Sequence, residues 1–325
     1  MIKVEGLTKR YGRVIAVDDI SFSVEKGQIV GFLGPNGAGK TTTMRVLTCF
    51  LPPTAGSVSV AGFDVLDQPL EVKRRVGYLP ESPPLYPEMK VADYLTFVAR
   101  LKGVPKGEVP RRLNEACEKC AIANARDRII GQLSKGYRQR VGLAQAVIHN
   151  PDVLILDEPT TGLDPKQIIE TRQLIRNLAG DHTVIMSTHI LPAVEQTCQQ
   201  VIVIDKGKVV ANDSVQNLTR RARGVEAVAV EVASRDGALD AGDVQRRLEQ
   251  VPGVSRVQLM ESGDQLCRLE VEGLAGRPIH DDVARAILDA GWRLLELRPV
   301  SLSLEQMFLE LTAATQEAAT EAAAK

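Results

Sequence analysis

The sequence has no excess of charge of either sign: 40 basic and 41 acidic residues give a formal net charge of -1. Proteins that bind nucleic acids or acidic membrane surfaces usually carry a basic excess or a basic patch. We therefore predict no nucleic-acid partner, and any other partner must be inferred from local motifs.

Long hydrophobic runs are also missing. No apolar stretch approaches the roughly 20 residues that a membrane-spanning helix needs, and the N-terminal MIKVEGLTKRYG lacks the apolar centre of a signal peptide. We expect a soluble, cytoplasmic protein. With 325 residues and 44% hydrophobic composition, the chain can bury at least one full core, and its length suggests about two domains.

Cysteine is scarce, with five residues in the whole chain, which excludes a disulfide scaffold. Cys117 and Cys120 form a single C-x-x-C pair within a helical pattern. A structural zinc site needs four ligands, and no second pair completes one. We therefore expect no metal or redox role for these two thiols.

Strand-like and helix-like patterns alternate through the first two thirds of the chain. Unbroken apolar runs, typical of buried strands, occur at residues 28–34, 152–158 and 183–188. The alternation predicts an α/β layer with a mostly parallel sheet. Between residues 88 and 150 only helical patterns remain, which predicts a helical subdomain inserted into a first domain of residues 1–222.

A second domain is predicted at residues 225–311, where a β-α-β order appears twice. Such a repeat is typical of a small ferredoxin-like α+β domain of βαββαβ order. Near its end, four apolar residues at helical spacing indicate a packing stripe. They are Leu304, Met307, Phe308 and Leu311. Residues 312–325 have few packing residues, and we expect a disordered tail.

Residues 34–41, GPNGAGKT, fit the pattern G-x-x-x-x-G-K-[ST] between a predicted strand and a predicted helix. Such a loop curls its backbone N–H groups around phosphates at a helix N-terminus. Lys40 is expected to reach the outer phosphates and the Thr41 hydroxyl to bind Mg²⁺. The predicted phosphate-binding residues are Gly34, Pro35, Asn36, Gly37, Ala38, Gly39, Lys40, Thr41 and Thr42.

Three polar residues follow two other apolar strands. Asp157 is suited to orient Mg²⁺, and Glu158 to polarise an attacking water. Adjacent acids at a strand end are also common as solvated turn residues, but a metal–nucleotide site needs carboxylates. A lone histidine such as His189 is often structural. However, ligands gather at the carboxyl ends of strands in α/β sheets, which favours a place near Glu158 and the γ-phosphate.

In this order the motifs resemble the ATP-binding cassette (ABC) ATPases, the nucleotide-hydrolysing subunits of ABC transporters. GPNGAGKTT is similar to their Walker A loop, VLILDEP to their Walker B strand, TGLD to their D-loop and His189 to their switch histidine. The resemblance implies a P-loop NTPase fold that uses ATP and Mg²⁺, with Glu158 as general base. It also implies that Tyr11 stacks on adenine and that Asp164, in the D-loop, belongs to the nucleotide site.

LSKGY, residues 133–137, stands where this family has its signature, commonly L-S-G-G-Q. Taken alone, Ser134 is a plausible helix N-cap. The resemblance implies that Ser134 and Gly136 cap the γ-phosphate held by the opposite subunit of a head-to-tail dimer. Lys135 and Tyr137 depart from the pattern. Lys135 could lean toward the phosphate or be solvated, and we prefer the second because lysine is normally exposed. Tyr137 is expected to pack or to contact adenosine.

Glu81 stands where the family commonly has the glutamine that senses Mg²⁺. A carboxylate binds a metal more strongly than an amide, but it adds negative charge near the γ-phosphate. We therefore count Glu81 among the metal-site residues, and leave open whether its carboxylate contacts Mg²⁺ directly. Both departures, at Glu81 and in the signature, resemble exporter-type cassettes associated with gliding motility and with sodium or drug efflux.

The resemblance predicts an ATPase subunit that powers a separate membrane permease and works as a homodimer or cassette dimer. It would be peripheral on the inner face of the cell membrane. Leu85, Tyr86 and Met89 are candidates for the permease contact, although their segment could be an ordinary rigid loop. The alternative is a non-transport ABC ATPase acting on ribosomes or DNA. Such proteins usually carry two cassettes or a coiled-coil insertion, and this sequence has neither.

Overall fold

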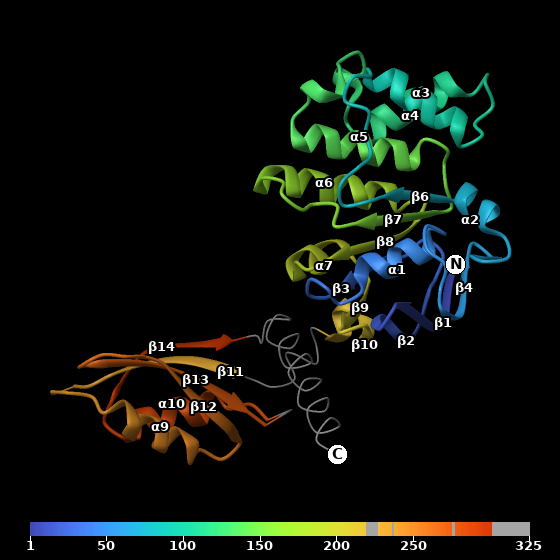
Figure 1. Cartoon of the computed structure of the whole chain (residues 1–325). Coiled ribbons are helices and arrows are strands. Elements are labelled where there is room, and N and C mark those ends of the chain that lie inside the picture. Colours follow the sequence, from blue (N-terminus) through green and yellow to red (C-terminus); the bar gives the residue numbers. More distant parts are fainter. Residues whose placement is uncertain (219–226, 236, 275–276, 301–325) are drawn as a thin grey trace. The chain divides into compact units, whose positions relative to one another are not determined.

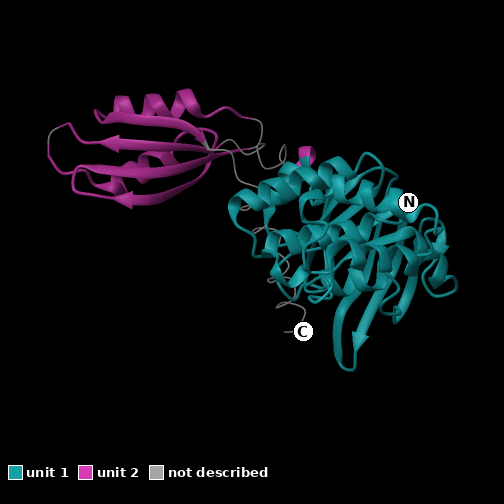
Figure 2. Cartoon of the chain, turned by 90° about the horizontal axis from the view of Figure 1, so that it is seen from above, with its two compact units in different colours: residues 1–215 teal, residues 216–325 magenta. Residues whose placement is uncertain are grey.

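The computed structural model describes residues 1–218, 227–235, 237–274 and 277–300. The chain forms two compact units, residues 1–215 and 216–325, coloured separately in Figure 2. The expected packing stripe from Leu304 to Leu311 and the expected tail at 312–325 lie outside the described residues.

The first unit is built on a six-stranded sheet of order β10-β9-β3-β8-β7-β6. β10 (Lys208–Ser214) is antiparallel to its neighbour, and the other strands run parallel to one another. These are β3 (Ile29–Leu33), β6 (Val76–Leu79), β7 (Val153–Asp157), β8 (Thr183–Thr188) and β9 (Gln200–Asp205). β3, β7 and β8 are buried along their whole length, as their unbroken apolar runs predict for parallel strands covered on both faces.

The register of these strands brings three loops to one edge of the sheet. Leu33 of β3 pairs with Thr188 of β8, and Ser187 of β8 pairs with Asp157 of β7. All three strands therefore end at nearly the same level. The loops that follow them begin side by side, at Gly34, Glu158 and His189.

A second, antiparallel sheet has the order β2-β1-β4-β5, and its β2 contacts β10 at the edge of the large sheet (Figure 1). Its strands are β1 (Ile2–Tyr11), β2 (Val14–Val24), β4 (Ala55–Val60) and β5 (Phe63–Asp64). One apolar core joins the two sheets, and in it the rings of Phe22 and Phe32 pack with centroids 5.6 Å apart. The sequence patterns considered above did not predict this sheet.

Helices surround the large sheet. They are α1 (Lys40–Leu47), α2 (Pro69–Arg75), α6 (Pro165–Leu178) and α7 (Leu191–Thr197). The expected helical region contains α3 (Val91–Leu101), α4 (Val109–Lys119) and α5 (Lys135–Val147), which gather beside the β6 edge (Figure 1). Lys102, at the C-terminal end of α3, links these three helices to the core, because its ammonium donates to the carbonyl oxygens of Lys73 and Val76.

The second unit has the element order β-α-β-β-α-β. Its elements are β11 (Ala227–Ala233), α9 (Ala241–Glu249), β12 (Val254–Ser262), β13 (Leu266–Gly273), α10 (His280–Asp289) and β14 (Arg293–Val300). The strands form an antiparallel sheet of order β12-β13-β11-β14. Alternate residues of β11, such as Val228 and Val230, are buried in a core shared with both helices.

Candidate active site

A cavity of about 350 Å³ opens at the edge where β3, β7 and β8 end. It is lined by Ala16, Asn36, Gly37, Gly39, Lys40, Thr41, Thr42, Glu81, Glu158, Thr161 and His189. All of these except Ala16 and Thr161 are site residues predicted from the sequence. The fold therefore brings the phosphate loop, Glu81, Glu158 and His189 to one place.

The phosphate loop reaches the N-terminus of α1 through two left-handed glycines, Gly37 with φ 81° and Gly39 with φ 106°. A Cβ on Gly39 would also stand 2.5 Å from the carbonyl oxygen of Ala16, so no side chain fits there. The loop thus depends on glycine for both its conformation and its close packing on β2.

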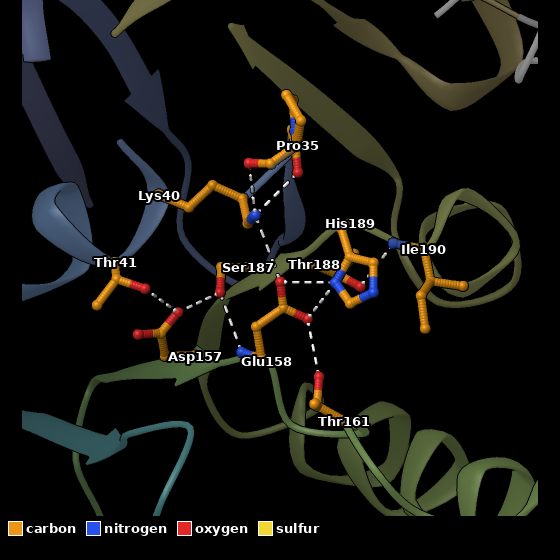
Figure 3. Close-up of polar contacts among 11 residues, drawn as sticks. Pro35, Lys40, Thr41, Asp157, Glu158, Thr161, Ser187, Thr188, His189 and Ile190 are labelled. Atoms are coloured by element: carbon orange, nitrogen blue, oxygen red, sulfur yellow. Dashed lines mark hydrogen bonds and ion pairs between the residues drawn. The ribbon is translucent and has the colours of Figure 1, made fainter. Parts of the chain in front are cut away.

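Lys40 is the first residue of α1, and its side chain is only 6% exposed. Its Nζ donates to the carbonyl oxygens of Gly34 at 2.8 Å and Pro35 at 3.1 Å, and lies 3.4 Å from Oε1 of Glu158 (Figure 3). Gly34, Pro35 and Ala38 do not line the cavity. Gly34 and Pro35 act on it indirectly, because their carbonyl groups orient Lys40.

Glu158 has an unusual backbone conformation, with φ 47° in the left-handed region that few non-glycine residues adopt. Its N–H donates to Ser187 through both the carbonyl oxygen, at 3.2 Å, and Oγ, at 3.0 Å. Strained residues of this kind cluster at functional sites, where surrounding contacts hold them. Here β8 supplies those contacts.

The Glu158 carboxylate is buried and has three neighbours (Figure 3). Thr161 Oγ1 donates to Oε2 at 3.1 Å, and Nδ1 of His189 lies 3.1 Å from both carboxylate oxygens. Lys40 is the third. The carboxylate is therefore fixed in direction, with a cation on one side and a half-exposed imidazole on the other.

Asp157 is 1% exposed and lies deeper than Glu158. Its Oδ1 accepts hydrogen bonds from Thr41 Oγ1, at 3.2 Å, and from Ser187 Oγ. Ser187 thus donates to one acidic residue and accepts from the backbone of the next. The Thr41 hydroxyl and the Asp157 carboxylate therefore lie together at the start of α1.

Besides Asp157 and the three loop residues Gly34, Pro35 and Ala38, four other predicted site residues do not line this cavity. Tyr11 ends β1 and is 45% exposed, with the Lys9 ammonium 5.4 Å from its ring centroid. Ser134 is the N-cap of α5, and its Oγ accepts from the N–H of Tyr137 at 3.3 Å. Asp164 is the N-cap of α6. Gly136 is buried at the start of α5.

Sequence reasoning missed Ser187 and Thr161. Ser187 lies inside the apolar run TVIMST, and its position opposite Asp157 depends on the strand register. A polar residue within a fully buried strand was the available signal, because buried hydroxyls require partners. Thr161 was noted as part of the D-loop sequence, but not as a contact of Glu158.

Comparisons with known proteins identify relatives of this chain. The profile of the ABC transporter family matches residues 17–161. The ABC transporter ATP-binding protein NatA of Bacillus subtilis is 39% identical over 207 residues, 63% of this chain and 84% of NatA. The Nod factor export ATP-binding protein I of Burkholderia thailandensis is 34% identical over 313 residues, 96% of each chain.

A likeness in fold accompanies these identities. The solved dimeric structure of a bacterial ABC transporter cassette, 24% identical, matches 66% of this chain and 99% of its own with a TM-score of 0.61. The phosphate loop, the two acidic residues and the histidine lie together on this fold. The chain belongs to the ATP-binding proteins of ABC transporters.

Proposed function

We propose that this chain is the ATP-hydrolysing subunit of an ABC exporter and powers a separate membrane permease through ATP-dependent dimerisation. The observation that carries the proposal is the convergence of Lys40, Glu158 and His189 in one cavity beside the phosphate loop. A relative that matches 96% of this chain is named for Nod factor export. That name favours export over a role on ribosomes or DNA.

Nucleotide binding would use the loop and Lys40. The backbone N–H groups at the start of α1 and the Lys40 ammonium would hold the phosphates. Lys40 would then exchange its contact with Glu158 for a contact with phosphate oxygens. The exposed ring of Tyr11 is available to stack on adenine.

Hydrolysis would use Glu158 as general base. Its carboxylate, held by Thr161 and His189, would take the proton of the attacking water, a role that contributes about 10²- to 10⁴-fold to a rate. His189 is 42% exposed in its side chain, so it can face both Glu158 and the phosphate group that accepts the water.

Mg²⁺ fits the oxygen donors at the start of α1. The Thr41 hydroxyl and the Asp157 carboxylate are the hard ligands that this ion prefers, and Glu81 lines the same cavity as Thr41. In the described part of the chain, no three His, Cys, Asp or Glu side chains are grouped to hold a metal alone. The remaining ligands would be phosphates and water, as is common for Mg²⁺. When bound, the ion would neutralise charge on the phosphates.

A dimer would complete the site. Ser134 and Asp164 are exposed N-caps that do not line the cavity of their own chain. The N-terminus of α5, capped by the neutral Ser134 and without an acidic residue in its first turn, is suited to bind an anion from elsewhere. We infer that Ser134, Gly136 and Asp164 serve the nucleotide of the opposite cassette in a head-to-tail dimer.

The permease contact would lie between the core and the helical region, next to α5. A groove of about 380 Å³ there is lined by Arg45, Phe50, Tyr78, Pro80, Ser82, Pro84, Lys102, Gln145 and Ala146. Phe50 is 69% exposed, and beside the groove Tyr86 packs against Tyr94 and Phe97 with its ring half exposed. Leu85 and Met89 are more buried than Tyr86.

We propose that a helix of the permease occupies this groove and holds the chain at the inner face of the membrane. Within the described residues, no helix is both long and apolar enough to cross a bilayer.

The test is ATP hydrolysis by the full-length chain and by Glu158→Gln. The variant should still bind ATP, hold the dimer closed and lose hydrolysis by about 10²-fold or more. Glu118→Gln, an exposed acid on α4, is the matched control and should keep normal activity. Near-normal hydrolysis by Glu158→Gln would remove Glu158 from the mechanism. Purification with ribosomes or DNA, and with no membrane protein, would favour the alternative function.

A further inference from the structure

Lys135, which departs from the family signature, reaches the D-loop of its own chain. Its Nζ lies 2.0 Å from the point where a Cβ on Gly162 would stand. Gly162 has φ 69°, a left-handed backbone conformation that favours glycine. The side chain of Lys135 is exposed, yet its end lies on the turn formed by residues 160–164.

That turn holds the proposed base. The Thr161 N–H donates to the Glu158 carbonyl oxygen at 3.1 Å, and Thr161 Oγ1 donates to the Glu158 carboxylate at 3.1 Å. Thr161 is adjacent to Gly162. A shift of the turn would therefore move a hydrogen-bond donor of the Glu158 carboxylate.

Other residues at the start of α5 fix the segment on either side of the turn. Gln139 Nε2 donates to the Pro159 carbonyl oxygen at 3.1 Å in a buried hydrogen bond. Gly136 packs so closely on Gln167 that an added Cβ would stand 2.5 Å from Oε1 of that side chain. Contacts from α5 thus hold the residues on both sides of the turn. Lys135 contacts the centre of the turn, at Gly162.

Neither helix stability nor an ion pair accounts for a lysine here. Lys135 is the first residue of α5, where the helix dipole disfavours a cation by about 0.3–1 kcal/mol, and the first turn has no acidic residue. Among the described residues, the side chain of Lys135 makes no hydrogen bond or ion pair. Its contact with Gly162 is the specific interaction that distinguishes this position.

We propose that Lys135 is a positioning residue for ATP hydrolysis: by lying across Gly162, it restrains the 160–164 turn and keeps Thr161 against Glu158. The inference rests on the proposed role of Glu158 as base. Lys135 is adjacent to Ser134, which is proposed to cap a phosphate held by the opposite cassette. The contact of Lys135 with the turn therefore connects Ser134 to Glu158, the base of its own chain. Lys135 itself does not line the cavity of its own chain.

The test is steady-state ATP hydrolysis by the full-length chain carrying Lys135→Ala. We expect kcat to fall about threefold to tenfold while KM for ATP stays the same, because orientation is lost and binding is not. Lys135→Arg should recover most of the rate. The melting temperature should not fall, since a cation is removed from a helix N-terminus. Lys106→Ala, at another exposed lysine, is the control.

A double-mutant cycle with Thr161→Val separates this role from a general effect on structure. If Lys135 acts through the turn, Lys135→Ala should slow the Thr161→Val protein far less than it slows the wild type. Fully additive losses would overturn the proposal, and so would a raised KM with unchanged kcat or no change in either. Normal hydrolysis by Glu158→Gln would instead defeat the proposed function, which distinguishes the two failures.

Discussion

The Lys40 ammonium and the Glu158 carboxylate lie 3.4 Å apart, and their side chains are only 6% and 9% exposed. Two opposite charges buried together neutralise each other, whereas either charge left alone in such a place is costly. Lys40 also donates to two loop carbonyls. An incoming phosphate must therefore compete with Glu158 for the same ammonium.

Glu158→Gln should consequently tighten ATP binding as well as stop turnover. Without its carboxylate partner, Lys40 keeps a buried charge that the phosphates alone can neutralise. Calorimetry should give a Kd for ATP several-fold lower than that of the wild type. The melting temperature without nucleotide should fall, and the rise on adding ATP should be larger. An unchanged Kd with an unchanged melting temperature would show that the pair contributes little.

Ser187→Ala should raise the Mg²⁺ concentration needed for half-maximal ATP hydrolysis. Ser187 Oγ orients both Asp157 Oδ1 and the N–H of Glu158, so its loss frees the proposed metal ligand. A rise of about tenfold is expected, as for other residues that orient metal ligands. The measurement is the hydrolysis rate against Mg²⁺ concentration at fixed ATP.

Thr183→Val is the matched control for Ser187→Ala. Thr183 is buried on the same strand at the end away from the site, where its Oγ1 accepts from the Gly27 N–H. Its loss should lower stability without changing the Mg²⁺ requirement. Equal requirements in the two variants would argue against an orienting role for Ser187.

The large sheet could be predicted because its strands are buried on both faces. An unbroken apolar run such as VLILD in β7 is typical of a central parallel strand that helices cover on both faces. The small antiparallel sheet gave a weaker signal. The pairing of β1 with β2 contains several register shifts, and each shift interrupts the alternation by which a half-buried strand is recognised.

The site could be predicted where a motif fixes the chemistry locally, as in the phosphate loop. Ser187 and Thr161 were missed because their roles come from contacts with Asp157 and Glu158 across the fold. Lys135 was expected to be solvated, and it is exposed, but its ammonium lies on Gly162. No local pattern predicts such a contact, because it depends on how α5 packs against the segment before α6.

The first unit should lose stability in mild acid through His149. Burial, and then the nearby charge of Lys102, lower the pKa of His149 to about 3, from an ordinary value of 6.5. Below about pH 6.5 the unfolded chain takes up a proton there and the folded chain does not, so stability declines as the pH falls toward 3. From pH 7 to 5.5 this amounts to about 1 kcal/mol.

His149→Gln removes the titrating group and keeps a donor for the Val76 carbonyl oxygen, which His149 Nε2 contacts at 3.2 Å. The variant should be less stable than the wild type at pH 7, but its urea midpoint should fall less between pH 7 and 5.5. An identical loss in both proteins would contradict this account of His149.

The head-to-tail arrangement predicts that two inactive chains can restore each other. Lys40→Ala loses the phosphate ligand, and Ser134→Arg blocks the proposed cap on the opposite nucleotide, so each variant alone should be inactive. In a mixed dimer, Lys40 of the Ser134→Arg chain meets the intact Ser134 of the Lys40→Ala chain. One site is then complete and the other carries both defects.

Equal mixing makes about half of the dimers mixed, each with one working site, so recovery of about a quarter of the wild-type rate is expected if the sites work independently. The measurement is ATP hydrolysis after the two variants are mixed. Mixing Ser134→Arg with the Ser134→Arg, Lys40→Ala double variant is the control, and it should recover nothing because no site receives both intact residues. If cross-linking detects mixed dimers and hydrolysis still does not recover, Ser134 does not serve the opposite site. Its exposed place at the start of α5 would then be that of an N-cap alone.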